Sequence, residues 1–107
     1  MSGPADPTVE ALLAQMRAQF TASLPAKVVA LEQLVARSAW QEARRAAHKL
    51  RGSASTYGHG AVSAAAGAIE EALIAAGDAP DESARAGIGA RLAEAGAAAS
   101  HAGGETR

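Results

Sequence analysis

The chain has 107 residues, contains no cysteine and carries a formal net charge of −1. A chain of this length builds one modest hydrophobic core, so we expect a single domain over residues 1–107. The missing cysteines exclude disulfides, thiolate catalysis and Cys-based zinc sites, and the near-zero net charge argues against nucleic acid or a membrane as a partner.

Hydrophobic residues make up 49% of the chain but aromatic residues only 3%. Much of this apolar content is alanine, which favours helices that approach one another closely, so the sequence predicts an all-α protein. No basic segment leads into an apolar run at the N-terminus, and no stretch approaches the roughly 20 apolar residues of a membrane span. We therefore expect a cytoplasmic protein.

The first predicted helix begins near Asp6 and Pro7. Asp6 is suited to cap the free backbone amides, and Pro7 has the φ angle of a first helical turn. Apolar residues follow at helical spacing, and we expect this stripe to pack on the rest of the protein. They are Val9, Leu12, Leu13, Met16 and Phe20.

Ser23 and Pro25 predict the start of a second helix, because proline is tolerated best in a first turn. Its apolar stripe runs over Leu24, Val28, Leu31, Leu34 and Val35. Ser38 and Gln41 then fit a capping box, in which each side chain satisfies a backbone amide. A third helix is therefore predicted to start at Ala39 and run to Tyr57, where Gly58 suits the left-handed conformation that closes a helix.

A fourth predicted helix follows the turn at His59 and ends at Gly77, and Asp78 and Pro80 open a fifth. The fifth helix contains several glycines and is expected to fray, with an ordered part over 6–99 and a flexible tail over 100–107. Short connections imply antiparallel neighbours. The predicted fold is an up-and-down antiparallel four-helix bundle with an additional N-terminal helix.

The third predicted helix has a polar face centred on His48. Projected at about 100° per residue, His48 points away from the apolar side of its helix. The residues within roughly 60° of it are Gln41, Arg44, Arg45, Arg51, Gly52 and Ser55. Gly52 weakens the helix without a packing reason and leaves a space one turn from the imidazole.

Four cations, Arg44, Arg45, Lys49 and Arg51, lie around His48 in an otherwise slightly acidic chain. Like charge disfavours the imidazolium, so we expect His48 to stay neutral and nucleophilic near pH 7. The same cations would attract and hold a phosphoryl group attached to the ring. This face therefore suits phosphoryl transfer.

The run His48-Lys49-Leu50-Arg51-Gly52-Ser53, with Gly58 closing the helix, is similar to the signature of histidine phosphotransfer (HPt) domains. The resemblance extends over residues 8 to about 98. It implies that His48 accepts the phosphoryl group on its ε nitrogen, that Arg51 contacts the phosphoryl oxygens and that Gly52 lets the partner come close. The family usually has Lys where this chain has Arg51, which affects rate and partner preference rather than the chemistry.

The resemblance also implies partners. They are the receiver domains of response regulators and a hybrid histidine kinase, and we expect Gln41, Arg44, Arg45, Lys49, Gly52 and Ser55 to bind them. The chain lacks a phosphate loop for ATP, so it is expected to be a monomeric phosphoryl carrier rather than an enzyme. No cofactor is expected on this chain, and magnesium would be held by the partner receiver domain.

Two alternatives come from other classes of protein. A helical adaptor or inhibitor could bind a histidine kinase or a receiver domain without phosphoryl chemistry, but it would need none of His48, Arg51 and Gly52. A purely structural bundle would leave Gly52 in mid-helix without a purpose. The combination of these three residues favours the active carrier.

The other polar residues carry weaker signals. His59 lies in a turn and His101 in the expected tail, and with no cysteine these histidines do not suggest a zinc site. Glu70 and Glu71 are adjacent on a helix and point about 100° apart, so we interpret both as solubilising surface charges.

Overall fold

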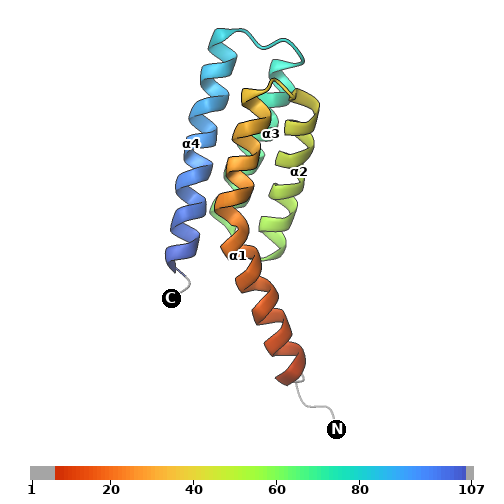
Figure 1. Ribbon diagram of the computed structural model, residues 1–107, viewed down its shortest axis with the longest axis vertical. Helices are drawn as coiled ribbons and strands as arrows, with labels where there is room; N and C mark the ends of the chain where they lie inside the picture. Colours follow the sequence, from red (N-terminus) through yellow and green to blue (C-terminus); the bar gives the residue numbers. More distant parts are fainter. Residues whose placement is uncertain (1–6, 106–107) are drawn as a thin grey trace.

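The computed structural model describes residues 7–105. These residues form four α-helices and no strand, and successive helices run in opposite directions (Figure 1). The helices are α1 (Pro7–Ala36), α2 (Trp40–Thr56), α3 (Gly60–Ala76) and α4 (Glu82–Glu105). The all-α prediction is confirmed, and the part of α1 beside α2, α3 and α4 completes a four-helix bundle.

The predicted break between a first and a second helix does not occur. α1 runs without interruption over 30 residues and includes Pro25 in its interior. Pro25 is exposed, whereas Leu24 and Val28 beside it are buried in the core. Core packing therefore holds the helix together although Pro25 has no amide to donate to the preceding turn. The predicted cap Asp6 lies outside the described residues.

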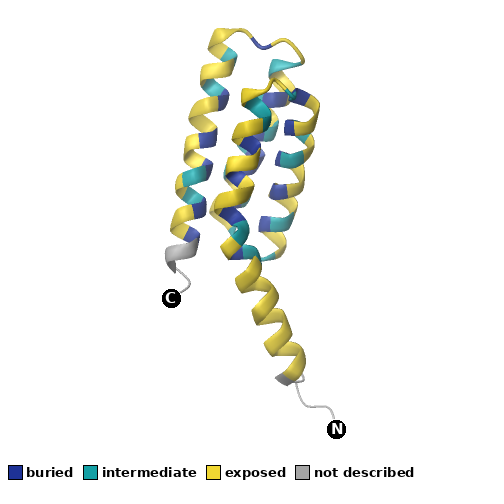
Figure 2. Ribbon diagram, viewed as in Figure 1, coloured by how far each residue is buried: buried dark blue, intermediate teal, exposed yellow. Residues whose placement is uncertain are grey.

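The N-terminal part of α1 projects beyond the end of the bundle (Figures 1 and 2). The apolar stripe that was expected to pack on the bundle is instead exposed at Val9, Leu12, Leu13 and Met16. Phe20, the last member of the stripe, stacks on Tyr57 with ring centroids 4.6 Å apart, next to the turn between α2 and α3. The bundle ends at this turn, so the preceding residues of α1 have no helix beside them.

The turn between α1 and α2 corrects a second prediction. Ala39, not Ser38, is the N-cap of α2, and it makes no side-chain capping hydrogen bond. Ser38 instead adopts a left-handed φ of 60° and closes α1. The amides of Ser38 and Ala39 donate to the carbonyls of Val35 and Leu34, which is the hydrogen-bond pattern of a Schellman motif.

The turn between α2 and α3 follows the sequence-based prediction. Gly58 has a φ of 81°, and its amide donates to the carbonyl of Ser55. His59 donates its amide to the carbonyl of Ala54 and is the N-cap of α3. The tight turn brings α2 and α3 together as antiparallel neighbours, which is the pairing that builds the candidate site.

The last helix extends further than expected. α4 continues through Glu105, and Ala99 and Ala102 are buried in the core, whereas the sequence predicted a flexible tail from residue 100. Residues 106–107 lie outside the described residues. α4 opens at Asp81 rather than at Asp78, because the Asp81 carboxylate accepts the amide of Ala84 at 2.8 Å.

The core consists mainly of small and aliphatic side chains from all four helices. Six of its larger members are less than 2% exposed: Leu24, Leu31, Val62, Ile69, Leu73 and Ile88. Between them lie alanines with no exposed surface: Ala43, Ala47, Ala54, Ala66, Ala95 and Ala99. Trp40 is the one aromatic residue of the core cluster in the described chain, and the Arg85 guanidinium lies 5.1 Å from its ring centroid.

Candidate functional site

His48 lies on the outer face of α2, about halfway along the helix. Its side chain is 75% exposed. One ring nitrogen, Nδ1, lies 2.7 Å from Oε2 of Glu70 on α3. No residue in the described part of the chain makes a hydrogen bond to Nε2. The imidazole is therefore held at one nitrogen and open at the other.

Glu70 is the main residue that the sequence analysis missed. Its side chain is only 14% exposed, so it is not a solubilising surface charge. Besides His48, it accepts a hydrogen bond at Oε1 from Nη1 of Arg51, at 3.3 Å. Glu71, the next residue, is exposed and belongs to no ion pair within residues 7–105.

The sequence alone could have placed Glu70 opposite His48, by counting residues from the turn between the two helices. In two antiparallel helices joined by a tight turn, residues at equal distances from the turn lie opposite each other. His48 precedes His59 by eleven residues and Glu70 follows it by eleven. From the sequence, His48 was expected to be surrounded by cations alone. The Glu70 carboxylate changes this local charge balance.

Arg51 lies against α3 where that helix has Gly67. A Cβ atom at Gly67 would be 3.3 Å from Nε and 3.4 Å from Cδ of Arg51, which is tighter than ordinary van der Waals contact. The missing side chain therefore makes room for the guanidinium to cross α3 and reach Glu70. The sequence analysis did not identify Gly67, because its role depends on the pairing of α2 with α3.

The surface beside Arg51 is open. Gly52 is exposed, and a Cβ atom at this position would meet nothing within 4 Å. An open groove of about 540 Å³ lies between α2 and α3 next to Arg51 and extends to the turn at Gly58. Mostly small side chains line it: Ser55, Gly60, Ser63, Ala64, Gly67 and Ala68, with Glu71 at its edge.

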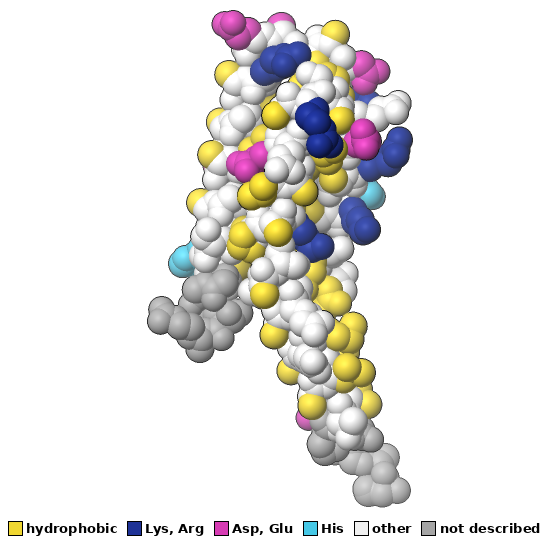
Figure 3. Space-filling model, in the orientation of Figure 1, with side chains coloured by type: hydrophobic (Ala, Val, Ile, Leu, Met, Phe, Trp, Pro, Cys, Tyr) yellow, Lys and Arg dark blue, Asp and Glu magenta, His cyan; other side chains and the backbone are white. Residues whose placement is uncertain are grey.

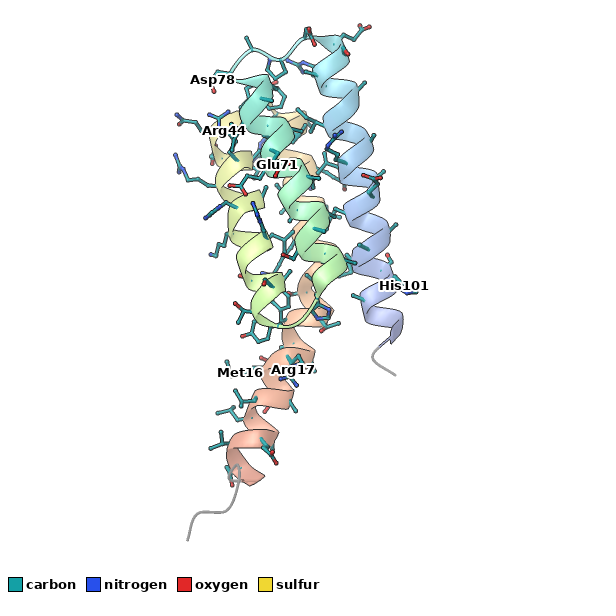
Figure 4. The ribbon with its side chains drawn as sticks, turned by 180° about the vertical axis from the view of Figure 1, so that it is seen from behind. Met16, Arg17, Arg44, Glu71, Asp78 and His101 are labelled. Carbon is teal, nitrogen blue, oxygen red and sulfur yellow. The ribbon has the colours of Figure 1, made fainter. Side chains whose placement is uncertain are left out.

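The remaining residues that were expected to bind a partner divide into two groups. Gln41, Arg45 and Lys49 are exposed on α2, and Figure 3 shows Lys and Arg side chains gathered near a histidine at the edge of the molecule formed by this helix. Arg44 is different, because Nη2 lies 2.9 Å from Oδ1 of Asp78 and the side chain is 23% exposed (Figure 4). This ion pair holds Arg44 against the loop that follows α3.

The other two histidines have different surroundings. Nε2 of His59 lies 2.8 Å from Oγ1 of Thr21, which is 4% exposed, so this ring connects the α2–α3 turn to α1. His101 lies on α4, on the helix rather than in a tail (Figure 4). In the described part of the chain, no group of three or more His, Cys, Asp or Glu side chains is placed to hold a metal ion.

The described residues thus form a four-helix bundle with an exposed histidine in the middle of α2. The family model of the Hpt domain matches residues 15–100, and the chain therefore belongs to the Hpt domain family. Hpt domains are phosphocarrier modules rather than catalytic enzymes. They take part in phosphotransfer in two-component signalling, where they interact with receiver domains and kinases.

Two further comparisons found no similar protein. Neither the curated proteins nor the solved structures gave a match to this chain. Among the described helices, none combines the length and the apolar character that crossing a membrane would need.

Proposed function

We propose that the chain is a phosphorelay carrier that accepts a phosphoryl group on Nε2 of His48 from a receiver-domain aspartate and passes it to another receiver domain. The observation that carries this proposal is the asymmetry of the imidazole, with Nδ1 bound to Glu70 and Nε2 open to solvent. A hybrid histidine kinase is the proposed source of the relay, and the cytoplasm its location.

The contact with Glu70 selects the nucleophilic nitrogen. An ionised carboxylate only accepts hydrogen bonds, so Nδ1 must carry the proton that it donates to Oε2. A neutral ring with its proton on Nδ1 has its lone pair on Nε2. Nε2 is therefore the atom that attacks phosphorus.

The transfer step needs little from the chain besides this orientation. The bond from Nε2 to phosphorus forms while the bond from phosphorus to the aspartate oxygen breaks, and the aspartate leaves as a carboxylate. The ring keeps its Nδ1 proton and gains positive charge, which the Glu70 carboxylate stabilises at 2.7 Å. The reverse reaction transfers the group to the second receiver domain.

Arg51 is placed to hold the phosphoryl oxygens. Its side chain is 51% exposed, one turn along α2 from His48, and one of its nitrogens is already committed to Glu70. The remaining N–H groups of the guanidinium are available for charge-assisted hydrogen bonds to phosphoryl oxygens. Glu70 thus orients both the nucleophile and the cation.

Gly52 and the adjacent groove provide the room for the partner. Because nothing lies within 4 Å of a Cβ atom at Gly52, the loops of a receiver domain can approach the backbone of α2 there. The magnesium ion implied by the family resemblance belongs to the acidic cluster of that receiver domain. A helical adaptor would require neither this clearance nor the oriented imidazole.

The test is incubation with a phosphorylated receiver domain, followed by measurement of the label on this chain. We expect acid-labile, alkali-stable label on the wild type and none on His48→Gln. His101→Gln is the matched control, because it removes an exposed imidazole from α4 and should keep the label. Equal labelling of His48→Gln and wild type would refute the proposal, and binding of the receiver without any transfer would identify an adaptor.

A further inference from the structure

The projecting part of α1 carries an apolar stripe that the bundle does not cover. Val9, Leu12, Leu13 and Met16 are 41–54% exposed, and Figure 3 shows hydrophobic side chains along this part of the helix, below the end of the bundle. Their spacing of three and four residues places them on one side of the helix. Exposed apolar stripes of this kind mark interaction surfaces.

This stripe continues the core-facing side of the same helix. Leu13 and Leu31 are 18 residues apart, which is five full turns, so their side chains leave α1 in the same direction. Leu31 is buried against the bundle, whereas Leu13 is 49% exposed on the part of α1 that projects beyond the bundle.

The spacing matches the seam of a two-helix coiled coil. Val9, Leu13, Met16 and Phe20 are separated by four, three and four residues, which is the alternation of a and d positions in a heptad. Over the projecting residues Thr8–Gln19 the only charged side chains are Glu10 and Arg17. They are seven residues apart, so both occupy the e position of the heptad, which flanks the seam. They carry opposite charges.

These charges fit a second copy of the chain in the antiparallel direction. If Leu13 packs opposite Met16 of a partner copy, Val9 reaches the end of the partner's bundle, where the half-buried Phe20 stacks on Tyr57. Glu10 of each copy then lies beside Arg17 of the other. The two bundles then lie at opposite ends of the helix pair. A parallel pair would instead leave both side chains without an opposite charge across the seam, because Arg17 would lie beside Leu12 of the partner copy. The parallel partner helix would also run into the position of the bundle.

We propose that this protein forms an antiparallel dimer through the projecting part of α1. The paired segment of about 13 residues is roughly 20 Å long, so the interface is small and we expect a dissociation constant of roughly micromolar size. The dimer replaces the monomer expected from the sequence. It does not depend on the phosphotransfer proposal, because His48 lies on another face of the molecule.

The first test is sedimentation equilibrium of the full chain, comparing wild type, Leu13→Asp and Val29→Asp. Leu13 and Val29 are almost equally exposed, at 49% and 48%, but Val29 lies on the opposite side of α1. We expect a dimer for wild type and Val29→Asp, and at least about a hundredfold weaker association for Leu13→Asp because a carboxylate enters the apolar seam. Equal effects of the two variants would overturn the proposal.

The second test uses the charges. Glu10→Arg and Arg17→Glu, made singly, each replace two attractive pairs with repulsive ones and should weaken the dimer by roughly tenfold. The double variant Glu10→Arg/Arg17→Glu should restore association. Failure of the double variant to restore it would exclude the antiparallel arrangement.

The absence of cysteine from the chain permits a third test by cross-linking. Disulfides form only between residues whose Cα atoms approach within about 7 Å. We therefore expect a Leu13→Cys protein mixed with a Met16→Cys protein to form the mixed disulfide faster than either protein cross-links with itself. Faster self-cross-linking of Leu13→Cys would instead indicate a parallel pair.

Two further outcomes would reject a second copy as the occupant. One is a wild-type chain that remains monomeric at concentrations up to about 1 mM. The other is a monomeric chain whose Leu13→Asp variant loses binding to a receiver domain while Val29→Asp keeps it, because the stripe would then bind that partner. His48→Gln should dimerise like the wild type, which separates this test from that of the proposed phosphotransfer.

Discussion

Glu70 decides how the imidazole of His48 is presented. Its two oxygens contact Nδ1 of His48 at 2.7 Å and Nη1 of Arg51 at 3.3 Å, so one carboxylate links the candidate nucleophile to the candidate phosphate-binding cation. Glu70 is only 14% exposed, whereas the side chains of His48 and Arg51 are 75% and 51% exposed, so both contacts lie at the surface of the bundle. The orientation of His48 therefore depends on α3 as well as on its own helix.

Replacing Glu70 with alanine should slow phosphoryl transfer without unfolding the protein. The variant removes a charge-assisted hydrogen bond worth about 1.5 kcal/mol, which corresponds to a rate reduction on the order of tenfold. Rapid-quench measurement of transfer from a labelled receiver domain would report it. Glu94→Ala on α4 is the control, since Glu94 is exposed and makes no ion pair with the described residues. Equal rates for Glu70→Ala and wild type would show that the carboxylate does not orient the ring.

Gly52→Ala should change stability and transfer in opposite directions. A methyl group at Gly52 meets nothing within 4 Å, so alanine should stabilise α2 by about 0.5–1 kcal/mol through its higher helix propensity. The same methyl group stands where we propose that the receiver domain approaches, so transfer should become slower. Urea denaturation and transfer kinetics measure the two effects.

The control for Gly52 is Gly89→Ala on α4. Gly89 is also exposed, lies within a helix and has nothing within 4 Å of an added Cβ. We expect a similar gain in stability and an unchanged transfer rate. If both variants transfer at the wild-type rate, Gly52 has no role in partner approach.

At the scale of the helices, one polar contact fixes the position of α1 against the α2–α3 turn. Oγ1 of Thr21 lies 2.8 Å from Nε2 of His59, and Phe20 stacks on Tyr57 next to it. Thr21 also donates to the carbonyl of Arg17 one turn earlier. These contacts lie where α1 leaves the bundle, so they anchor the start of the projecting segment.

Thr21→Val should destabilise the bundle, because it keeps the shape of the side chain but leaves the half-buried Nε2 of His59 without this partner. We expect the free energy of unfolding to fall by about 1–2 kcal/mol. Urea denaturation measures the loss. Ser23→Ala is the control, since the Ser23 hydroxyl donates only to the carbonyl of Phe20 in its own helix. A loss for Ser23→Ala as large as that for Thr21→Val would show that the contact between Thr21 and His59 adds no more stability than a hydrogen bond within one helix.

At the scale of the whole molecule, alanine sets the distance between the helices. Ala43 and Ala47 on α2, Ala66 on α3 and Ala95 on α4 have no exposed surface. Where such residues face a neighbouring helix, the backbones can approach more closely than larger side chains would allow. The molecule is long and narrow as a result, 60 × 24 × 19 Å, with the projecting part of α1 adding to its length.

Enlarging one of these alanines should disturb the entire bundle. Ala47→Leu introduces three carbon atoms into a site with no free surface, and we expect a loss of about 1–3 kcal/mol in the free energy of unfolding. Thermal and urea denaturation both report it. Ala86→Leu on the exposed side of α4 adds the same atoms in solvent and should change stability by less than about 0.5 kcal/mol. A tolerant Ala47→Leu variant would mean that the helices are not closely packed there.

The candidate phosphotransfer site and the apolar stripe of α1 lie in different parts of the molecule. The candidate phosphotransfer site is on the side of the bundle formed by α2 and α3, and the apolar stripe of α1 lies beyond the end of the bundle. An antiparallel dimer would therefore present two His48 sites, one on each bundle. Both sites would remain open to receiver domains.

Features of the protein that depend on local chemistry could be predicted from its amino-acid sequence. Glycine is the residue that accepts a left-handed φ most easily, so Gly58 and Gly77 mark the ends of α2 and α3, and both have positive φ in the structure. Helical periodicity separates the buried side of α2 from its polar side, which is why His48 was expected to point outward. The signature around His48 also indicated the family that the family model confirmed.

Features that depend on neighbouring helices became visible only in the folded chain. Pro25 and Ser38 were misinterpreted because core packing continues α1 through the proline, and the turn after α1 uses the serine in a left-handed conformation. Glu70 and Gly67 gained their roles because α2 and α3 pair across a tight turn. The stripe on α1 is exposed because α1 extends beyond the end of the bundle. The periodicity of a helix shows which side is apolar, but not how far its neighbours extend along it.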